Sequence, residues 1–425
     1  MASVGIGVAQ SILCFYINVY YSVILAWVLY YLFSSFTTVL PWSTCGNPWN
    51  SDNCREHHWS VNSTNATYNW TSSQDASFTN VSDFRAMDPA TEYWERKVLA
   101  ISAGVEFSGS IKWDLALCLL LAWVVVYFCV WKGIKLSGKI SYVTVISPYI
   151  LLVVLLIRGA TLPGAGKGIH FYLSPEWSKL GVVKVWVEAG IQVFFSYGVG
   201  LGIHTSLASC NSFHHNCLKH HLIFSLANTC TSLLGGFVIF SVLGFMADKY
   251  QLSVAHVAGS GPGLAFVAYP EAVAQMPIAP LWSCIFFLLL FFVGIDSQFL
   301  QVEAFMVMLG DLLPQEFQRS PRKEICTAVA CLIWFCLGLC MVTEGGIYVE
   351  QLFEWYAGGR VIMFIVVLEC LAISYVYGVN RLQRNLEYML GYRLFPYFKV
   401  CWAAITPLLG GFLFIMDIVL YPEQT

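Results

Sequence analysis

The sequence QVFFSYGVGLG, residues 192–202, lies inside an apolar run that contains no Asp, Glu, Lys or Arg from residue 189 to residue 218. Each of its three glycines weakens a helix by about 1 kcal/mol relative to alanine, so we expect the helix to break here. A break at membrane depth exposes backbone groups, which is tolerated only around a cavity and suits an ion or a carboxylate. Close helix packing on small residues is the alternative, and the spacing alone leaves both open.

The composition around this stretch is that of a membrane protein. Of the 425 residues, 58% are hydrophobic and only 11% are charged, whereas roughly a quarter of the residues of a globular protein are charged. The net charge of −3 provides no basic surface for a nucleic-acid backbone, so we expect no nucleic-acid partner. Because the sequence shows no Ser/His/Asp set, phosphate loop or metal-spaced Cys/His cluster, we expect a protein that is not an enzyme.

Nine apolar stretches are long enough to cross a bilayer, for which a helix needs about 20 mostly apolar residues. They predict an all-α polytopic protein, with one transmembrane domain over residues 1–425 and the lipid bilayer as its partner. The predicted spans are 6–34, 113–131, 140–158, 186–208, 221–246, 278–308, 325–343, 359–379 and 398–419.

The polar loop at 35–112 sets the orientation of these spans. It contains four Asn-X-Ser/Thr sequons within about 20 residues, which predicts glycosylation and therefore a position outside the cytosol. The short loops at 132–139, 312–324 and 380–399 are basic, as cytoplasmic loops are. We therefore expect the N-terminus inside, the C-terminus outside, and a second extracellular loop with short helices at 247–277. The predicted glycosylation sites are Asn62, Asn65, Asn69 and Asn80.

Two of the fifteen cysteines, Cys45 and Cys54, stand in the polar loop, whereas the others lie in or beside apolar runs. An oxidising compartment would allow this pair to form a disulfide. Two free thiols are the alternative.

Polar residues within two further predicted spans are candidates for an ion site. Asn228 and Ser232 lie one helical turn apart, and their oxygens suit a hard cation such as sodium. Hydrogen bonding between helices is the alternative there. Asp296 follows a long apolar run, and no basic residue lies inside a neighbouring span, so we favour an ion ligand over a salt bridge.

Several motifs outside these stretches are specific in both residue type and order. They are CGNPWN at 45–50 with Cys54, EYWER at 92–96, RG at 158–159 with TLPGA at 161–165, GPGLAF at 261–266 followed by YPEA at 269–272, GIDS at 294–297 and GGIYV at 345–349. With these motifs the whole chain resembles the neurotransmitter:sodium symporters, the sodium- and chloride-dependent carriers of GABA, taurine, creatine, betaine and similar solutes. Residues 194–202 and 341–346 are most similar to the GABA, taurine and creatine branch.

The resemblance implies a fold and an activity. The family's fold is an inverted repeat of five plus five helices with the substrate at the bilayer midplane. Aligned with the twelve helices of the family, this chain would cover the third to the eleventh and would lack the first two and the last. The implied activity is symport of a small zwitterionic solute of the GABA, taurine, creatine or betaine class, coupled to sodium and chloride ions, across the plasma membrane. A truncated, transport-inactive product that acts as a partner of intact carriers is the alternative, and homo-oligomerisation is left open.

The resemblance also implies roles for single residues. Tyr21 would bind the substrate carboxylate through its hydroxyl, and Phe195 would close the pocket as an outer lid. Gln301 stands where GABA carriers have Thr or Cys, which argues against GABA itself. The family's first helix contributes ligands to both sodium ions, and its second helix contributes to chloride. The implied sets are Tyr21, Phe195, Tyr197, Gly198 and Gln301 for the substrate; Ser196 and Asn228 for one sodium; the carbonyl of Val293 with Asp296 and Ser297 for the other; Gln192, Ser196 and Ser232 for chloride; and Phe195, Glu354 and Asp311 for the gates.

Overall fold

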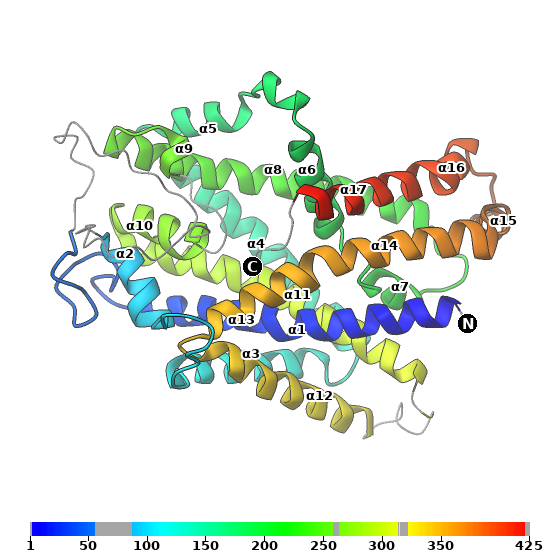
Figure 1. Cartoon of the computed structure of the whole chain (residues 1–425), viewed down its shortest axis with the longest axis horizontal. Helices are drawn as coiled ribbons and strands as arrows, with labels where there is room; N and C mark the ends of the chain where they lie inside the picture. The colour runs from blue at the N-terminus through cyan, green and yellow to red at the C-terminus, as the bar shows by residue number, and fades with distance from the viewer. Residues whose placement is uncertain (1, 56–86, 258–262, 313, 315–321, 421–425) are drawn as a thin grey trace.

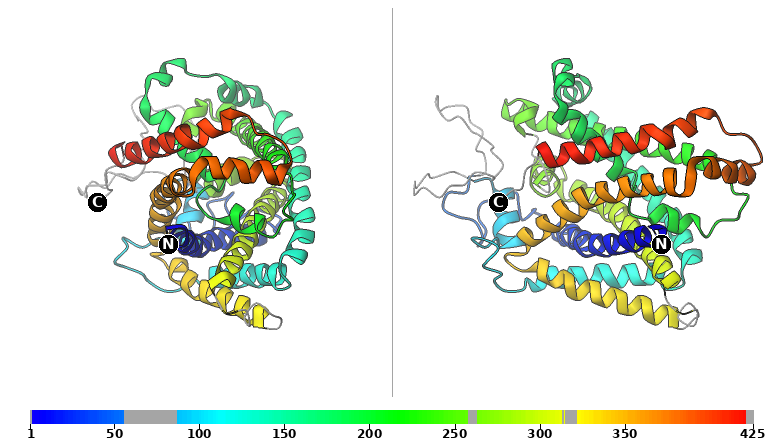
Figure 2. Two further views of the ribbon diagram at one scale, coloured as in Figure 1. Left: turned by 90° about the vertical axis from the view of Figure 1, so that its right-hand side faces the viewer. Right: turned by 45° about the vertical axis from the view of Figure 1, so that its right-hand side comes forward.

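The computed structural model describes residues 2–55, 87–257, 263–312, 314 and 322–420. Within these ranges the regular structure is helical, and pairing between extended segments is limited to two isolated β-bridges. Most of the long helices run roughly along the long axis of the molecule, as Figure 1 and the right-hand view of Figure 2 show. The all-α architecture predicted from the apolar runs is confirmed.

Eight helical stretches in the described residues are long and apolar enough to cross a membrane. They match eight of the nine predicted spans, and the ninth, 186–208, is divided in two. The ends differ most at 359–379, where the helical stretch runs over Gly346–Leu390, because π-helical turns extend it past polar residues. The helices are α1 (Ala2–Ser34), α3 (Trp113–Val130), α4 (Ile134–Ala160), α8 (Cys217–Tyr250), α11 (Ala279–Leu312), α12 (Arg322–Gly338) with η5 (Leu339–Val342), α13 (Gly346–Phe353) with η6 (Glu354–Arg360), α14 (Val361–Leu371), η7 (Ala372–Gly378) and α15 (Val379–Leu390), and α16 (Pro396–Val400) with η8 (Cys401–Ile405) and α17 (Thr406–Leu420).

The shorter elements connect these helices. Two of them, α6 and α7, occupy the divided span. The shorter elements are α2 (Pro89–Glu92), η1 (Tyr93–Leu99), α5 (Ala165–Leu173), η2 (Trp177–Gly181), α6 (Val183–Ser196), α7 (Ile203–Ala208), α9 (Val254–Val257), η3 (Leu264–Ala268) and α10 (Tyr269–Ala274).

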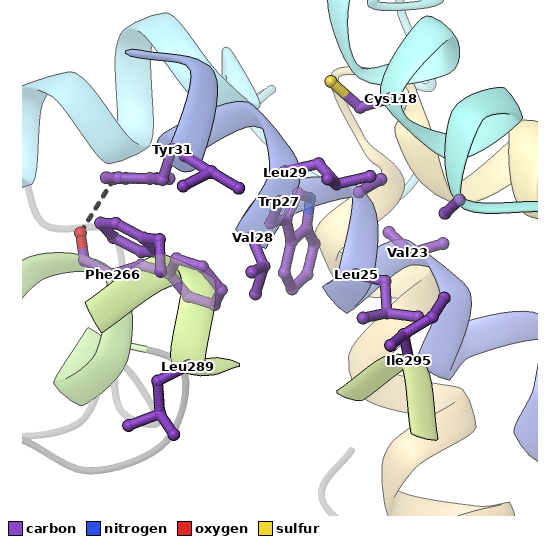
Figure 3. Packing of buried hydrophobic residues seen from close by; sticks show 14 of the residues in the cluster. Val23, Leu25, Trp27, Val28, Leu29, Tyr31, Cys118, Phe266, Leu289 and Ile295 are labelled. Carbon is purple, nitrogen blue, oxygen red and sulfur yellow. Dashed lines mark hydrogen bonds between the residues drawn. The ribbon is translucent and has the colours of Figure 1, made fainter. Parts of the chain in front are cut away.

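Helix α1 contributes many of the side chains of the buried core. It has no charged residue along its length and packs against α3, α11, α12 and α14. Figure 3 shows its fully buried Trp27 among apolar side chains from several helices. Near the C-terminal end of α1, Tyr31 donates a hydrogen bond from its hydroxyl to the carbonyl of Phe266 at 2.8 Å, which fastens α1 to η3. These contacts fix the height and rotation of α1 in the bundle.

The polar loop after α1 is held by a disulfide and a buried carboxylate. Cys45 and Cys54 are joined, so the predicted disulfide is confirmed. Glu92 is fully buried and accepts hydrogen bonds from the side chain of Asn50 at 3.1 Å and the backbone N–H of Ser51 at 3.0 Å. The four predicted glycosylation sites lie outside the described residues.

Candidate substrate and ion site

The stretch at 192–202 breaks the helix, as the sequence predicts. Helix α6 ends at Ser196 and α7 begins at Ile203. Between them Gly198, Gly200 and Gly202 have φ angles of +62°, +85° and +71°. Glycine adopts this left-handed region without the steric cost that a Cβ brings, so the alternate glycines permit the sharp change in direction.

The end of α6 meets α8 at the first candidate sodium set. The side-chain nitrogen of Asn228 donates a hydrogen bond to the hydroxyl of Ser196 at 2.9 Å. Ser232, one turn further along α8, donates to the backbone carbonyl of Asn228 at 3.0 Å. The side chains of Ser196, Ser232 and Gln192 are exposed. The structure therefore brings Ser196 and Asn228 together and leaves the candidate chloride residues on an open face.

The second candidate sodium set lies on α11. Asp296 accepts a hydrogen bond from the hydroxyl of Thr144 on α4 at 2.5 Å, and Ser141 on the same helix lies nearby. Ser297 donates to the carbonyl of Val293 at 3.2 Å. Sequence reasoning found the three α11 residues but missed Thr144 and Ser141. The sequence feature that could have indicated these two residues is a pair of hydroxyl side chains three positions apart in an apolar helix.

Tyr21 on α1 lies beside this second set. Its hydroxyl lies beside the side chain of Ser297 and 3.9 Å from the position that a Cβ on Gly294 would take. The same Cβ would come within 2.6 Å of the Leu25 side chain, so glycine at 294 allows α1 and α11 to approach closely. The residue implied to bind the substrate carboxylate thereby lies beside a candidate sodium ligand.

Buried amides connect the same two helices. Gln298 on α11 donates from its side-chain nitrogen to the side-chain oxygen of Asn18 on α1 at 3.0 Å, and both residues are fully buried. Gln301, one turn further, is also buried, and its backbone carbonyl accepts a weak hydrogen bond from the thiol of Cys14. Sequence reasoning did not single out Asn18, although it is one of two amide side chains, with Gln10, in a long apolar helix.

A cavity of about 540 Å³ lies beside the helix break, lined in part by Tyr197, Gly198, His204 and Glu369. His204 has its Nε2 atom 2.7 Å from the backbone carbonyl of Tyr197. The cavity thus includes two of the predicted substrate residues. Phe195, Tyr21 and Gln301 are not among the residues that line it.

The two predicted gate carboxylates lie at different levels of the bundle. Glu354 begins η6 and Asp311 lies in the last turn of α11, and both side chains are exposed. Phe195, the predicted lid, has 46% of its surface exposed. The structure does not place these three residues together.

The fold and the site define a polytopic helical membrane protein with an interrupted helix and oxygen-rich groups at membrane depth. A model of the sodium:neurotransmitter symporter family matches residues 2–425, and the chain belongs to this family. The resemblance seen in the motifs is confirmed.

Curated relatives agree with the predicted branch. The chain is 48% identical over 419 residues to the mouse sodium- and chloride-dependent creatine transporter 1, covering 98% of this chain and 65% of that protein. It is 45% identical over 422 residues to the rat sodium- and chloride-dependent GABA transporter 2, covering 99% and 68%. It is 46% identical over 422 residues to the bovine sodium- and chloride-dependent taurine transporter, covering 99% and 66%. The chain therefore spans about two thirds of the length of these relatives.

Proposed function

We propose that this chain forms the greater part of a symporter that carries a small zwitterionic solute across the plasma membrane, coupled to sodium and chloride. The observation that carries the proposal is the contact between Ser196, at the end of the broken helix, and Asn228 on α8. It joins a side-chain hydroxyl and an amide to free backbone groups at membrane depth, which suits ion coordination. The names of the relatives support both the ions and the solute class.

Two oxygen-rich groups would hold the sodium ions. Ser196 and Asn228 would serve one ion, and rotation of the Asn228 amide would turn its oxygen toward that ion. The carbonyl of Val293 with Asp296 and Ser297 would serve the other. Asp296 supplies a negative charge, and its bond to Thr144 holds the carboxylate in place. Gln192, Ser196 and Ser232 would hold chloride through their N–H and O–H donors.

The solute would lie between α1 and the helix break. Tyr21 would donate its hydroxyl to the solute's carboxylate, with Tyr197, Gly198 and Gln301 around the remainder. The contact between Tyr21 and Ser297 supports coupling, because an ion at the second set would fix the hydroxyl that receives the solute.

The surroundings of the site would control access to it. Phe195 and Glu354 would act on the outer side and Asp311 on the inner side. In this arrangement the loop at 35–112 and the C-terminal end of the chain face outside, and the N-terminal end faces the cytosol.

The test is uptake of labelled GABA, taurine, creatine and betaine by cells that express this chain, beside a form extended at both ends from the genomic locus. We expect uptake of at least one solute by the extended form, which is lost when sodium or chloride is replaced. Surface biotinylation verifies that both forms reach the plasma membrane. If neither form transports any of the four solutes although both reach the surface, the proposed function is wrong.

A further inference from the structure

A groove of about 400 Å³ opens on the surface of the bundle where α3, α4 and α11 meet. Val125 and Cys129 line it from α3, Val143 and Thr144 from α4, and Ile295 from α11. Val143 is 62% exposed, so the groove faces away from the interior of the bundle. At membrane depth the surroundings of such a groove are lipid chains, because the bilayer core holds no water.

One end of this groove is basic and the remainder is apolar. Lys139 is the only charged residue among the described residues that line it, and its side chain is exposed. It lies in the second turn of α4, and in the short loop before that helix the Nζ atom of Lys132 lies 4.6 Å from the ring centroid of Trp131. Tryptophan and snorkelling basic side chains are typical of the level of the lipid head groups. Thr144 lies about 7.5 Å further along the axis of α4, so the groove begins at the head-group level and runs into the membrane.

The same groove reaches the second candidate sodium set. Thr144, which lines it, donates the hydrogen bond to Asp296 at 2.5 Å, and Ile295 immediately precedes Asp296 in α11. Thr144 is 6% exposed and Ile295 is 2% exposed, so the packing around them holds both in place. A lipid chain in the groove therefore packs against two residues that fix the position of the carboxylate.

We propose that this groove binds an anionic phospholipid, with one acyl chain packed between α3, α4 and α11 and the phosphate bonded to Lys139. In the orientation proposed above, the loop before α4 faces the cytosol, and the cytoplasmic leaflet is the one that carries anionic lipids. Basic pockets between membrane helices on that side bind the head groups of such lipids. Charge complementarity favours this occupant over a sterol or a zwitterionic phospholipid, because neither brings a net charge to Lys139.

The bound lipid also acts on the sodium set, because its chain holds Thr144 and Ile295 beside Asp296. This effect rests on the function proposed above, in which Asp296 binds a sodium ion, whereas lipid binding requires only the proposed orientation. An occupied groove fixes the carboxylate before the ion arrives, so the lipid raises the affinity for sodium.

The test is photolabelling of the intact protein in vesicles of phosphatidylcholine. Three probes each carry a diazirine in the apolar part of the molecule: a phosphatidylserine, a phosphatidylcholine and a cholesterol. Mass spectrometry identifies the labelled residues, and we expect phosphatidylserine to label the groove more strongly than the other two probes do. Lys139→Gln should reduce that labelling by about fivefold, the effect of one basic residue near an anionic head group. Val143→Trp places an indole in the groove and should abolish the preference for phosphatidylserine.

The matched controls are Lys219→Gln and Val145→Trp. Lys219 is an exposed lysine in the first turn of α8, on the cytosolic side in the proposed orientation, and Val145 is an exposed valine of α4 that does not line the groove. Both variants should be labelled like the unmodified protein. Equal labelling of the groove by phosphatidylserine and phosphatidylcholine would overturn the proposal, and stronger labelling by cholesterol would assign the groove to a sterol instead. If no probe labelled the groove, another segment of the protein would cover it, and the proposal would be wrong.

The effect on sodium is measured separately, as the sodium concentration at the midpoint of the Tm shift of the purified intact protein. With phosphatidylserine in the micelles we expect a lower midpoint than with phosphatidylcholine alone, and no such difference in Lys139→Gln. Equal midpoints in the unmodified protein would overturn the effect on sodium. A Tm that does not respond to sodium at all would instead count against the proposed function, and the photolabelling would still decide whether the lipid binds.

Discussion

The two candidate ion sets differ in how far this chain encloses them. On α11, Asp296 receives a hydrogen bond from Thr144 of α4, and Ser297 lies beside Tyr21 of α1. Where the end of α6 meets α8, Ser196 and Asn228 bond to each other, but the Ser196 side chain is exposed. The α11 set is therefore assembled by three helices of this chain. The set at the break is an open polar face at membrane depth, where polar groups require further partners.

The largest effect should come from removing the enclosed charge. Replacing Asp296 by Ala removes the only carboxylate of the α11 set, and no oxygen on α4 carries a compensating charge. We expect sodium-dependent uptake by the intact protein to be abolished. Uptake is measured across a range of sodium concentrations, with surface biotinylation to normalise it.

Asp114→Ala is the matched control, since Asp114 is an exposed carboxylate in the first turn of α3. It should keep uptake close to that of the unmodified protein. Retention of uptake by Asp296→Ala at ordinary sodium would remove Asp296 from the proposed site.

The comparison also shows what the sequence could predict. The break at 192–202 was predictable because alternate glycines are rare in a helix, and Asp296 because a lone carboxylate in an apolar helix is conspicuous. The links from Thr144 to Asp296 and from Tyr21 to Ser297 were not, because they depend on the rotation and height of helices far apart in sequence. Hydroxyl residues occur in many apolar helices without an ion, so their type alone did not identify them.

A second prediction concerns the backbone at the break. Alanine at position 200 would have to adopt a φ of +85°, with its Cβ 2.7 Å from a methyl group of Val366. We expect Gly200→Ala to destabilise the protein by about 1–3 kcal/mol, as other residues held in this backbone region do. The Tm of the purified protein measures the effect.

Gly235 on α8 is the matched control, because a Cβ there meets no atom within 4 Å. Gly235→Ala should leave the Tm unchanged or raise it slightly, since alanine is the better helix former by about 1 kcal/mol. Equal Tm values for the two variants would mean that the break tolerates ordinary residues.

A third prediction concerns a buried carboxylate outside the predicted spans, where the pH of the solvent can act on it. Glu271 lies in α10, outside the predicted spans, and burial raises its pKa to about 8, with Asp88 adding to the shift and a hydrogen bond from Tyr250 at 2.9 Å opposing it. The folded protein therefore keeps a proton that the unfolded chain releases near its ordinary pKa of 4.5. Stability is fully present below that value and falls as pH rises through about 8.

Glu271→Gln removes this titration without changing the size of the side chain. We expect the Tm of the unmodified protein to fall between about pH 5 and pH 8 more steeply than that of the variant. The underlying loss in the free energy of unfolding is up to about 1.4 kcal/mol per pH unit. Parallel pH profiles for the two proteins would show that Glu271 is ionised in the folded state.

The smallest expected change concerns the open face, where a new charge can be accommodated. Because the Ser232 side chain is exposed, Ser232→Glu places a carboxylate one helical turn from Asn228, the partner of Ser196, without disturbing a packed neighbour. If chloride binds there through Gln192, Ser196 and Ser232, the fixed negative charge replaces it, and uptake should persist when chloride is exchanged for gluconate.

Ser232→Gln has nearly the same size without the charge and should keep the chloride requirement. If uptake by the Ser232→Glu variant still required chloride, the chloride site would not lie on the α6–α8 face. That result would leave that face with sodium as its only proposed ion, and the contrast with the enclosed α11 set would rest on solvent access alone.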